Sequence, residues 1–241
     1  MSRFAGLGAA LLGLGLAAVS HPDLAGPLVR ALGLQAGTPV PAGRLLWLAE
    51  RHLTLALGGF ALAGGIGVML GILATRAAGA PLRDAIETLA AAAQAAPPVV
   101  VVGLALPLLG FGAPPTLLAL AAYGLMPVLR GTVDALATVP AEVRGAAAAI
   151  GMTPGQILWR IELPLAARPI LEALRVVMLL AVATAALGAL AGAPTLGTPI
   201  VVGLQNQNGL HLVQGAAAAA GLAFLADAAF QAARALARRW I

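Results

Sequence analysis

The sequence is poor in charge and contains neither cysteine nor lysine. Only 10% of its 241 residues are charged, whereas 61% are hydrophobic and the mean hydropathy is +0.96; soluble globular domains carry roughly 25% charged residues. The lack of cysteine excludes disulfides and thiolate chemistry. The lack of lysine excludes a P-loop, whose Lys reaches the β- and γ-phosphates of a nucleotide. The only serines, Ser2 and Ser20, leave no serine nucleophile at membrane depth. We therefore expect no catalytic site and no bound cofactor.

Long apolar runs are present instead, and they indicate an integral membrane protein. Leu, Ala and Val fill these runs without the period-2 alternation of a membrane β-barrel, so the runs predict helices. The fold class is therefore all-α, with six membrane-spanning segments at about 4–19, 53–75, 86–109, 114–130, 170–190 and 213–233.

The arginines predict how these segments are oriented. With the N-terminus in the cytoplasm, only Arg30, Arg44 and Arg51 face outward, and the other eleven of the fourteen face inward. Positive charge marks the cytoplasmic loops of membrane proteins. The net charge of +5 then reflects these loops, and we expect no nucleic-acid partner. The long connection at about 131–169 and the C-terminal arginines Arg238 and Arg239 are predicted to be cytoplasmic.

The first apolar segment has two interpretations. Ala18-Val19-Ser20 resembles the small-residue cleavage site of a signal peptide. A retained span is favoured, because 21–43 is too short to form a domain. Residues 44–52 are expected to form an interfacial helix, with Trp47 at the depth of the lipid headgroups. The chain thus divides into an N-terminal segment, 1–44, and a core, 45–241.

Small residues and prolines mark the interior of the spans. Ala63, Gly67 and Gly71 form a stripe that lets helices approach closely, either within this chain or between subunits. Prolines at 97, 98, 107, 114, 115 and 127 are expected to interrupt the third and fourth spans. Such breaks are tolerated where protein or a water-filled cavity satisfies the freed backbone groups. A solute pathway or gate is predicted near these helices, with candidate residues Pro97, Pro98, Tyr123 and Asp227.

The segment 138–169 is too polar to span the membrane and is patterned as two helices. Pro140 and Glu142 suit the first turn of one helix, and Gly151 is placed to end it. Thr153 to Gln156 predicts a capping box that begins a second helix, which Pro164 is expected to stop. The segment 138–169 contains more apolar side chains than a free loop would expose to water. We expect a partner to dock on this segment.

The spacing within this segment resembles that of a known family. Ala146-Ala147, then Gly151, then nine residues, then Ile161-Glu162-Leu163-Pro164 is similar to the EAA loop of binding-protein-dependent ABC importer permeases. Residues 94–132 and 151–175 are similar to the osmoprotectant type, which imports glycine betaine, choline or carnitine. The resemblance runs from about residue 45 to the C-terminus and implies a five-span permease core, to which the first segment adds one span.

The resemblance also implies partners. These are a cytoplasmic ABC ATPase that uses the ATP, a second permease subunit in a homo- or heterodimer, and an extracytoplasmic solute-binding protein. Gly145 stands where the motif has Glu, and we hypothesise that Glu142 partly substitutes for it. Trp159, Ile161 and Leu163 are the expected apolar knobs. The complete ATPase-coupling set is Glu142, Arg144, Gly145, Ala146, Ala147, Gly151, Trp159, Ile161, Leu163 and Pro164.

Several alternatives stay open from the sequence. The solute could instead be a sulfonate, an oxyanion or methionine. An ATP-independent secondary transporter would need several ionisable groups at membrane depth, where only Asp227 is available. Asp227 could equally make an ordinary contact between helices, and the polar run 205–208 could be an outer gate, a binding-protein contact or a solvated turn. His21, His52 and His211 are scattered, so no metal site is expected.

Overall fold

The computed structural model describes residues 2–76, 81 and 83–237. This part of the chain is built of helices and turns, which confirms the all-α class. The helices are α1 (Ser2–Val19), α2 (Pro22–Ala31), α3 (Ala42–Ala74), α4 (Arg83–Ala95), α5 (Pro98–Leu109), α6 (Ala113–Ala137), α7 (Ala141–Ala149), α8 (Pro154–Ile157), the π-helix η2 (Leu158–Glu162), α9 (Leu163–Ala185), the 3₁₀-helix η3 (Ala186–Ala191), α10 (Gly197–Gln205) and α11 (Gly209–Ala237).

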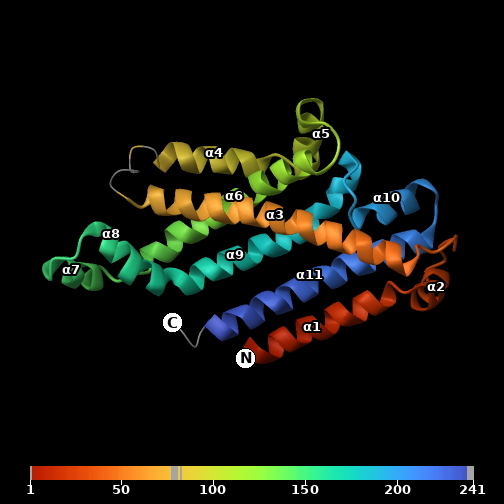
Figure 1. Cartoon of the computed structure of the whole chain (residues 1–241), viewed down its shortest axis with the longest axis horizontal. Helices are drawn as coiled ribbons and strands as arrows, with labels where there is room; N and C mark the ends of the chain where they lie inside the picture. The colour runs from red at the N-terminus through yellow and green to blue at the C-terminus, as the bar shows by residue number, and fades with distance from the viewer. Residues whose placement is uncertain (1, 77–80, 82, 238–241) are drawn as a thin grey trace.

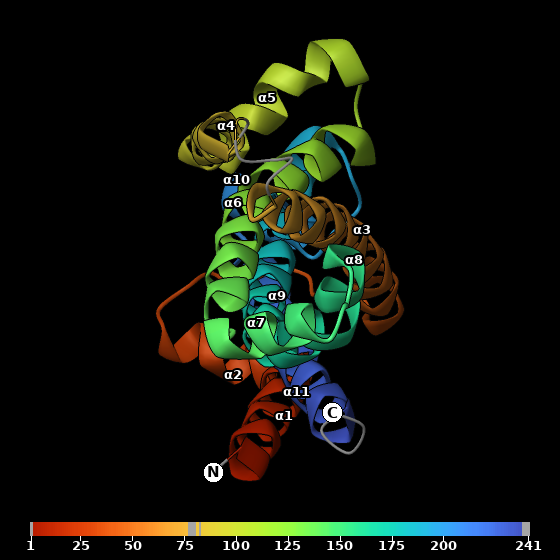
Figure 2. The same ribbon diagram turned by 90° about the vertical axis from the view of Figure 1, so that its left-hand side faces the viewer.

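The long helices run roughly lengthwise and cross at an angle, α4 lies alongside α3, and the other short helices lie toward the two ends (Figures 1 and 2). Helices α7 and α8 lie at one end, together with the last turn of α3, the start of α1 and the last turns of α11 (Figure 1). Helices α2, α5 and α10 lie at the other end. The connections that the arginine pattern assigned to one side of the membrane therefore meet at one end of the molecule. Arg238 and Arg239 lie outside the described residues.

Four continuous helical segments are long and apolar enough to cross a membrane, judged by length and composition. They are α3, α6, the run Pro154–Ala191, and Gly209–Ala235 of α11. The first and third predicted segments are instead bent pairs of helices. Gly6–Val19 meets α2 at 84°, and Asp84–Ala95 meets α5 at 95°. If each bent pair counts as one span, the total is six.

The prolines break the helices at fewer places than expected. Of the six prolines expected to interrupt the third and fourth spans, only Pro97 and Pro98 stand at a sharp break, where Pro97 precedes the first turn of α5 and Pro98 begins it. Neither residue offers a backbone N–H, so α4 cannot continue through them. Pro107 and Pro127 lie inside continuous helices, and the pair 114–115 begins α6, a position that proline favours. The expected interruption of the fourth span is therefore wrong.

Residues 44–52 do not form a separate interfacial helix. They are the first turns of α3, whose 33 residues run unbroken from Ala42, a length of about 50 Å. This helix is longer than a hydrocarbon core of about 30 Å, so its first turns can stand outside the core without a break. Trp47 lies half-buried there, with the guanidinium carbons of Arg44 and Arg51 at 4.3 and 5.8 Å from the centre of its ring.

Pro164 does not stop the helix that follows α8. The helical run continues through η2 into α9, and Pro164 lies in the first turn of α9. In a regular α-helix, the proline ring would clash with the carbonyl group of the residue four positions earlier. Here the N–H of Leu163 bonds to the carbonyl group of Leu158, five residues back, and this wider turn accommodates the proline. The fifth predicted span, 170–190, thus begins well inside a longer helix.

The stripe of small residues on α3 packs within the chain, against α6. A Cβ atom at Gly71 would lie 2.7 Å from Cβ of Thr132 and 2.9 Å from the carbonyl oxygen of Leu129. A Cβ atom at Gly67 would lie 2.7 Å from Cβ of Val128. The absent side chains thus allow the two backbones to approach closely. Of the two interpretations of this stripe, the contacts identify packing inside one subunit.

The N-terminal helices are tied to α11. A Cβ atom at Gly13 of α1 would lie 2.8 Å from Cγ of Leu225, so α1 and α11 are in close contact. The wholly buried amide of Gln214 on α11 accepts from the Val40 N–H at 2.8 Å and donates to the carbonyl group of Ser20 at 3.0 Å. The Gln214 side chain therefore holds both the corner between α1 and α2 and the segment 32–41 that leads to α3.

Substitution of Gly71 by Ala should destabilise the protein. The new methyl group would meet the backbone oxygen of Leu129, so α3 and α6 must move apart, at a cost of about 1–3 kcal/mol. Gly65→Ala is the matched control, because no atom lies within 4 Å of its Cβ position on the same helix. Thermal unfolding in detergent should give a lower midpoint for Gly71→Ala alone, and equal midpoints for both variants would contradict the packing.

Candidate functional site

The turn between α7 and α8 folds as its sequence predicts. Helix α7 begins after Pro140 and carries Glu142 in its first turn, where a negative charge meets the positive end of the helix dipole. Gly151 follows the helix with φ of +84°, a conformation that favours glycine. Its N–H bonds to the carbonyl group of Ala148 at 3.0 Å. The predicted end of the first helix is confirmed.

The predicted capping box at the start of α8 is also confirmed. The Gln156 N–H donates to Oγ1 of Thr153 at 3.3 Å, and the Thr153 N–H donates to Oε1 of Gln156 at 2.9 Å. The N–H groups of Thr153 and Gln156, which have no partner within the helix backbone, are thereby satisfied. Two short helices separated by a tight, capped turn make a compact projection at this end of the molecule (Figure 1).

The projection exposes large apolar side chains. Trp159 is 71% exposed and Ile150 is 80% exposed. Ile161 and Leu163 are only half-buried, and Leu163 packs against the buried cluster that includes Leu136 and Ile170. Of the three predicted knobs, Trp159 is therefore the prominent one, and Ile150 is a second that the sequence analysis missed. Among the other predicted coupling residues, Ala147 is buried, Arg144 is half-buried and Glu142, Gly145, Ala146, Gly151 and Pro164 are exposed.

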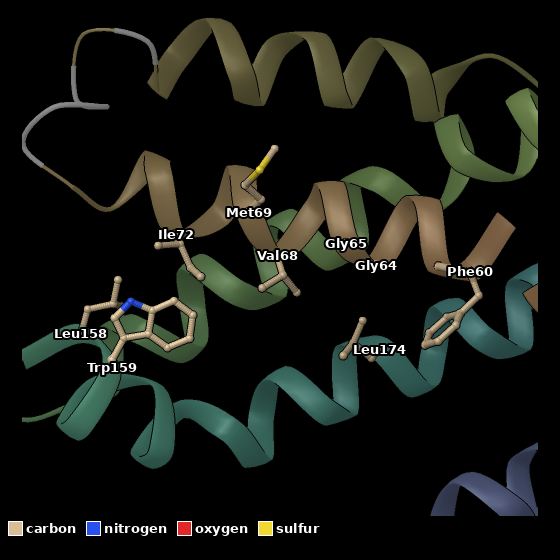
Figure 3. Close-up of a pocket in the computed structure, with 10 residues that line it drawn as sticks. Phe60, Gly64, Gly65, Val68, Met69, Ile72, Leu158, Trp159 and Leu174 are labelled. Atoms are coloured by element: carbon tan, nitrogen blue, oxygen red, sulfur yellow. The ribbon is translucent and has the colours of Figure 1, made fainter. Parts of the chain in front are cut away.

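An apolar groove of about 590 Å³ runs from this projection between α3 and α9 (Figure 3). Trp159 and Leu158 lie at one end of the groove beside Ile72 of α3, and Phe60 and Leu174 lie at the other (Figure 3). The exposed indole thus sits where the coupling segment meets the long helices.

Glu162 is buried at the base of the projection between two arginines. Its carboxylate oxygens lie 2.7 Å from Arg76 Nη1, just beyond the end of α3, and 2.9 Å from Arg144 Nε of α7. At both contacts the N–H bond is not aimed along the line to the oxygen, so the attraction is that of charge pairs more than of linear hydrogen bonds. Arg144 also donates to the carbonyl group of Leu136 near the end of α6. The sequence analysis missed this cluster, although an acid within an otherwise apolar motif was a signal for it.

Asp227 joins two spans near the same end of the molecule. It accepts from Arg175 of α9 through both carboxylate oxygens, at 2.5 and 2.9 Å, and from Gln231 at 2.8 Å. Glu172 lies 3.8 Å from Arg175, as the i,i+3 spacing predicts, and 2.5 Å from Arg234 of α11. Asp227 is thus a member of an ion-pair network that links α9 to α11.

The other pathway candidates lie on separate elements. Pro97 and Pro98 form the corner between α4 and α5, and Tyr123 lies half-buried within α6. Neither element carries Asp227, which pairs instead with α9. Helices α4 and α5 both pack on α6, whereas Asp227 of α11 is held by Arg175 of α9.

The segment 191–212, which includes α10, combines exposed and structural polar groups. Gln205, Asn206 and Gln207 are exposed, whereas Asn208 is buried and donates to the carbonyl group of Thr38 at 2.9 Å. His52, which is wholly buried, bonds to the carbonyl group of Val182 at 2.8 Å and accepts from the Leu196 N–H at 3.3 Å. It therefore crosslinks α3, α9 and the segment 191–212. Among the described residues, no group of three or more His, Asp or Glu could hold a metal ion.

Comparison with known proteins identifies the family. Residues 67–240 match the family described as "binding-protein-dependent transport system inner membrane component". The match covers more than half of the chain, and the chain belongs to this family. It is therefore a multi-pass membrane permease subunit of an ABC importer.

Curated relatives agree with this assignment. The chain is 34% identical over 183 residues to the osmoprotectant import permease protein OsmY of Salmonella typhimurium, covering 76% of this chain and 78% of the relative. It is 31% identical over 186 residues to the glycine betaine/carnitine/choline transport system permease protein OpuCD of Bacillus subtilis, covering 77% and 80%. It is 39% identical over 131 residues to the ergothioneine transport permease/ergothioneine binding protein EgtU of Helicobacter pylori, covering 54% of this chain but 24% of that longer protein.

A solved structure shares the fold. A chain from the inward-facing MetNI methionine ABC transporter superposes with a TM-score of 0.73 at 21% identity, covering 81% of this chain and 97% of that chain. This likeness supports the arrangement of the helices alone.

Replacement of Asp227 by Asn should lower the stability of the purified protein. Arg175 would lose its partner in a half-buried position, and breaking such a pair costs about 2–3 kcal/mol. Glu50→Gln, at an exposed position on α3, is the control and should leave thermal unfolding in detergent unchanged. An unchanged unfolding midpoint together with lost solute uptake would instead place Asp227 on the solute pathway.

Proposed function

We propose that this chain is driven by a separate cytoplasmic ABC ATPase that docks on the α7–η2 surface. The observation that carries the proposal is the exposure of Ile150 and Trp159 on a compact projection at one end of the long helices. Large apolar side chains that project beyond the spans are otherwise costly in contact with water. The family to which the chain belongs supports an ATP-driven system, and the spacing of its EAA-like segment supports the place of docking.

The α7–α8 end is proposed to lie in the cytoplasm. Its described arginines, which include Arg76, Arg144 and Arg160, support this orientation by the positive-inside rule. Helix α1 is proposed to be a retained span, and its close packing on α11 supports that role. The outer end, with α2, α5 and α10, would then face an extracytoplasmic solute-binding protein.

The chain itself is proposed to bind no nucleotide. It has no lysine with which to build a P-loop, so the energy must arrive through contact with another protein. A second permease subunit, identical or homologous, is proposed to complete the translocation path. Closure of the ATPase would move the coupling segments, and rigid-body rocking of the long helices would open the path alternately to each side.

The proposed solute is a small osmoprotectant such as glycine betaine, choline or carnitine. The names of the relatives OsmY and OpuCD support this class. The relative EgtU keeps ergothioneine open as an alternative, and sulfonates, oxyanions and methionine remain alternatives of the same mechanism. An ATP-independent transporter is less well supported, because the Asp227 carboxylate is already paired with Arg175.

Reconstitution of the complete system tests the proposal. The chain should copurify with an ATPase subunit encoded beside it, and vesicles that contain both should accumulate radiolabelled glycine betaine or choline only with ATP and the binding protein. Ergothioneine and methionine serve as competing solutes. Uphill uptake by the chain alone, or uptake driven by a pH gradient without ATP, would contradict the proposal.

Glu142→Ala examines the polar part of the docking surface in the same vesicles. Glu142 is exposed in the first turn of α7 and lies one helical turn before Gly145, the position at which the motif has Glu. We expect less solute accumulated per ATP hydrolysed. The control is Asp84→Ala, an exposed acid on α4, which should leave this ratio unchanged. If Glu142→Ala keeps the wild-type ratio, then Glu142 does not take over the role of the Glu that the motif has at position 145.

A further inference from the structure

We infer that Glu162 is a positioning residue, which locks the coupling helix α7 to the long helices so that they move as one body. The inference rests on the proposed function, since it concerns how movement of an ATPase reaches the spans. It assigns a role to the residue between Ile161 and Leu163, a place at which the motif Ile-x-Leu-Pro specifies no side chain.

Three elements meet at this carboxylate, and a fourth is tied to them through Arg144. Glu162 itself belongs to η2, which continues directly into α9. Arg144 of α7 lies 2.9 Å from one carboxylate oxygen, and Arg76, which follows the end of α3, lies 2.7 Å from the other. The guanidinium group of Arg144 also donates to Leu136 in the last turn of α6. Helices α3, α6, α7 and α9 are thus joined through one acid and two bases.

The burial of the acid makes separation of Glu162 from its two arginines costly. The Glu162 side chain is 5% exposed, whereas those of Arg76 and Arg144 are 28% and 37% exposed. A buried carboxylate without a cation is strongly unfavourable, so Glu162 cannot lose both partners while it stays buried. The arginines keep part of their contact with solvent, and their pull on Glu162 therefore holds α7 against the base of α9.

The position of Arg144 connects the junction to the docking surface. Arg144 directly precedes Gly145, where a Cβ atom would meet nothing within 4 Å. The face of α7 at Gly145 is therefore open to a partner, while its neighbour Arg144 reaches back to Glu162. A push on this face would be passed through Arg144 and Glu162 to α9, and through Arg76 to α3.

Replacement of Glu162 by Gln tests the inference in vesicles that contain the permease, the ATPase and the binding protein. The amide keeps the shape of the side chain and removes the charge. We expect E162Q to copurify with the ATPase and to hydrolyse ATP, but to accumulate at least about tenfold less solute per ATP, since the two arginines lose the charge that holds α7 to α9. Asp134→Asn, an exposed acid on α6, is the matched control and should keep the wild-type ratio.

A chemical rescue separates mechanical linkage from a loss of structure. Because the chain has no cysteine, R144C/E162C carries the two introduced thiols alone, and a short spacer with a thiosulfonate at each end can join them as mixed disulfides, with sulfinate as the leaving group. The unlinked double variant should be uncoupled, and the linked one should regain solute uptake per ATP until a reductant cuts the spacer.

Each outcome either supports or overturns the role assigned to Glu162. An E162Q complex that does not assemble, or one that keeps the wild-type ratio, overturns the inference, as does a linked R144C/E162C complex that stays uncoupled. Failure of the proposed function would look different, because the wild-type chain itself would then bind no ATPase or take up no solute with ATP.

Discussion

The burial of one carboxylate between two guanidinium groups organises the α7–α8 end of the molecule. Glu162 can be buried there only because Arg76 and Arg144 approach it from α3 and α7. The carboxylate thereby joins the end of α3 to two neighbouring segments that lie much later in the sequence, and the capped projection of α7 and α8 extends from this junction.

The long helices connect this end of the molecule to the opposite end. The run Pro154–Ala191 joins the projection to the segment 191–212, because η2 accommodates Pro164 without ending the helix. At the α10 end of the molecule, His52 joins α3 and α9 to the backbone at Leu196. Near the coupling end, the pair Arg175–Asp227 joins α9 to α11. These contacts favour movement of packed helices as rigid bodies over local bending, in keeping with alternating access.

Local patterns in the sequence predicted local structure well. The end of α7 at Gly151 and the capping box at Thr153 depend on residues a few positions apart, and both are confirmed. Pro164 misled the analysis, because its effect depends on how the preceding turn adjusts, which the residue alone does not reveal. The partners of Glu162 and Asp227 were also beyond reach, since Arg76 and Arg175 lie 86 and 52 positions away and one sequence does not say which helices pack together. The apolar groove beside Trp159 depends on the same tertiary packing.

Site-specific crosslinking tests the central claim most directly, namely that a separate motor engages the α7–α8 end. A photoreactive maleimide attached to I150C at the projection should crosslink a co-expressed ATPase subunit, because Ile150 is 80% exposed there. The same reagent on Q207C, an exposed position beside α10 at the other end, should not reach the ATPase. An adduct with the ATPase from position 207 and none from position 150 would contradict the account.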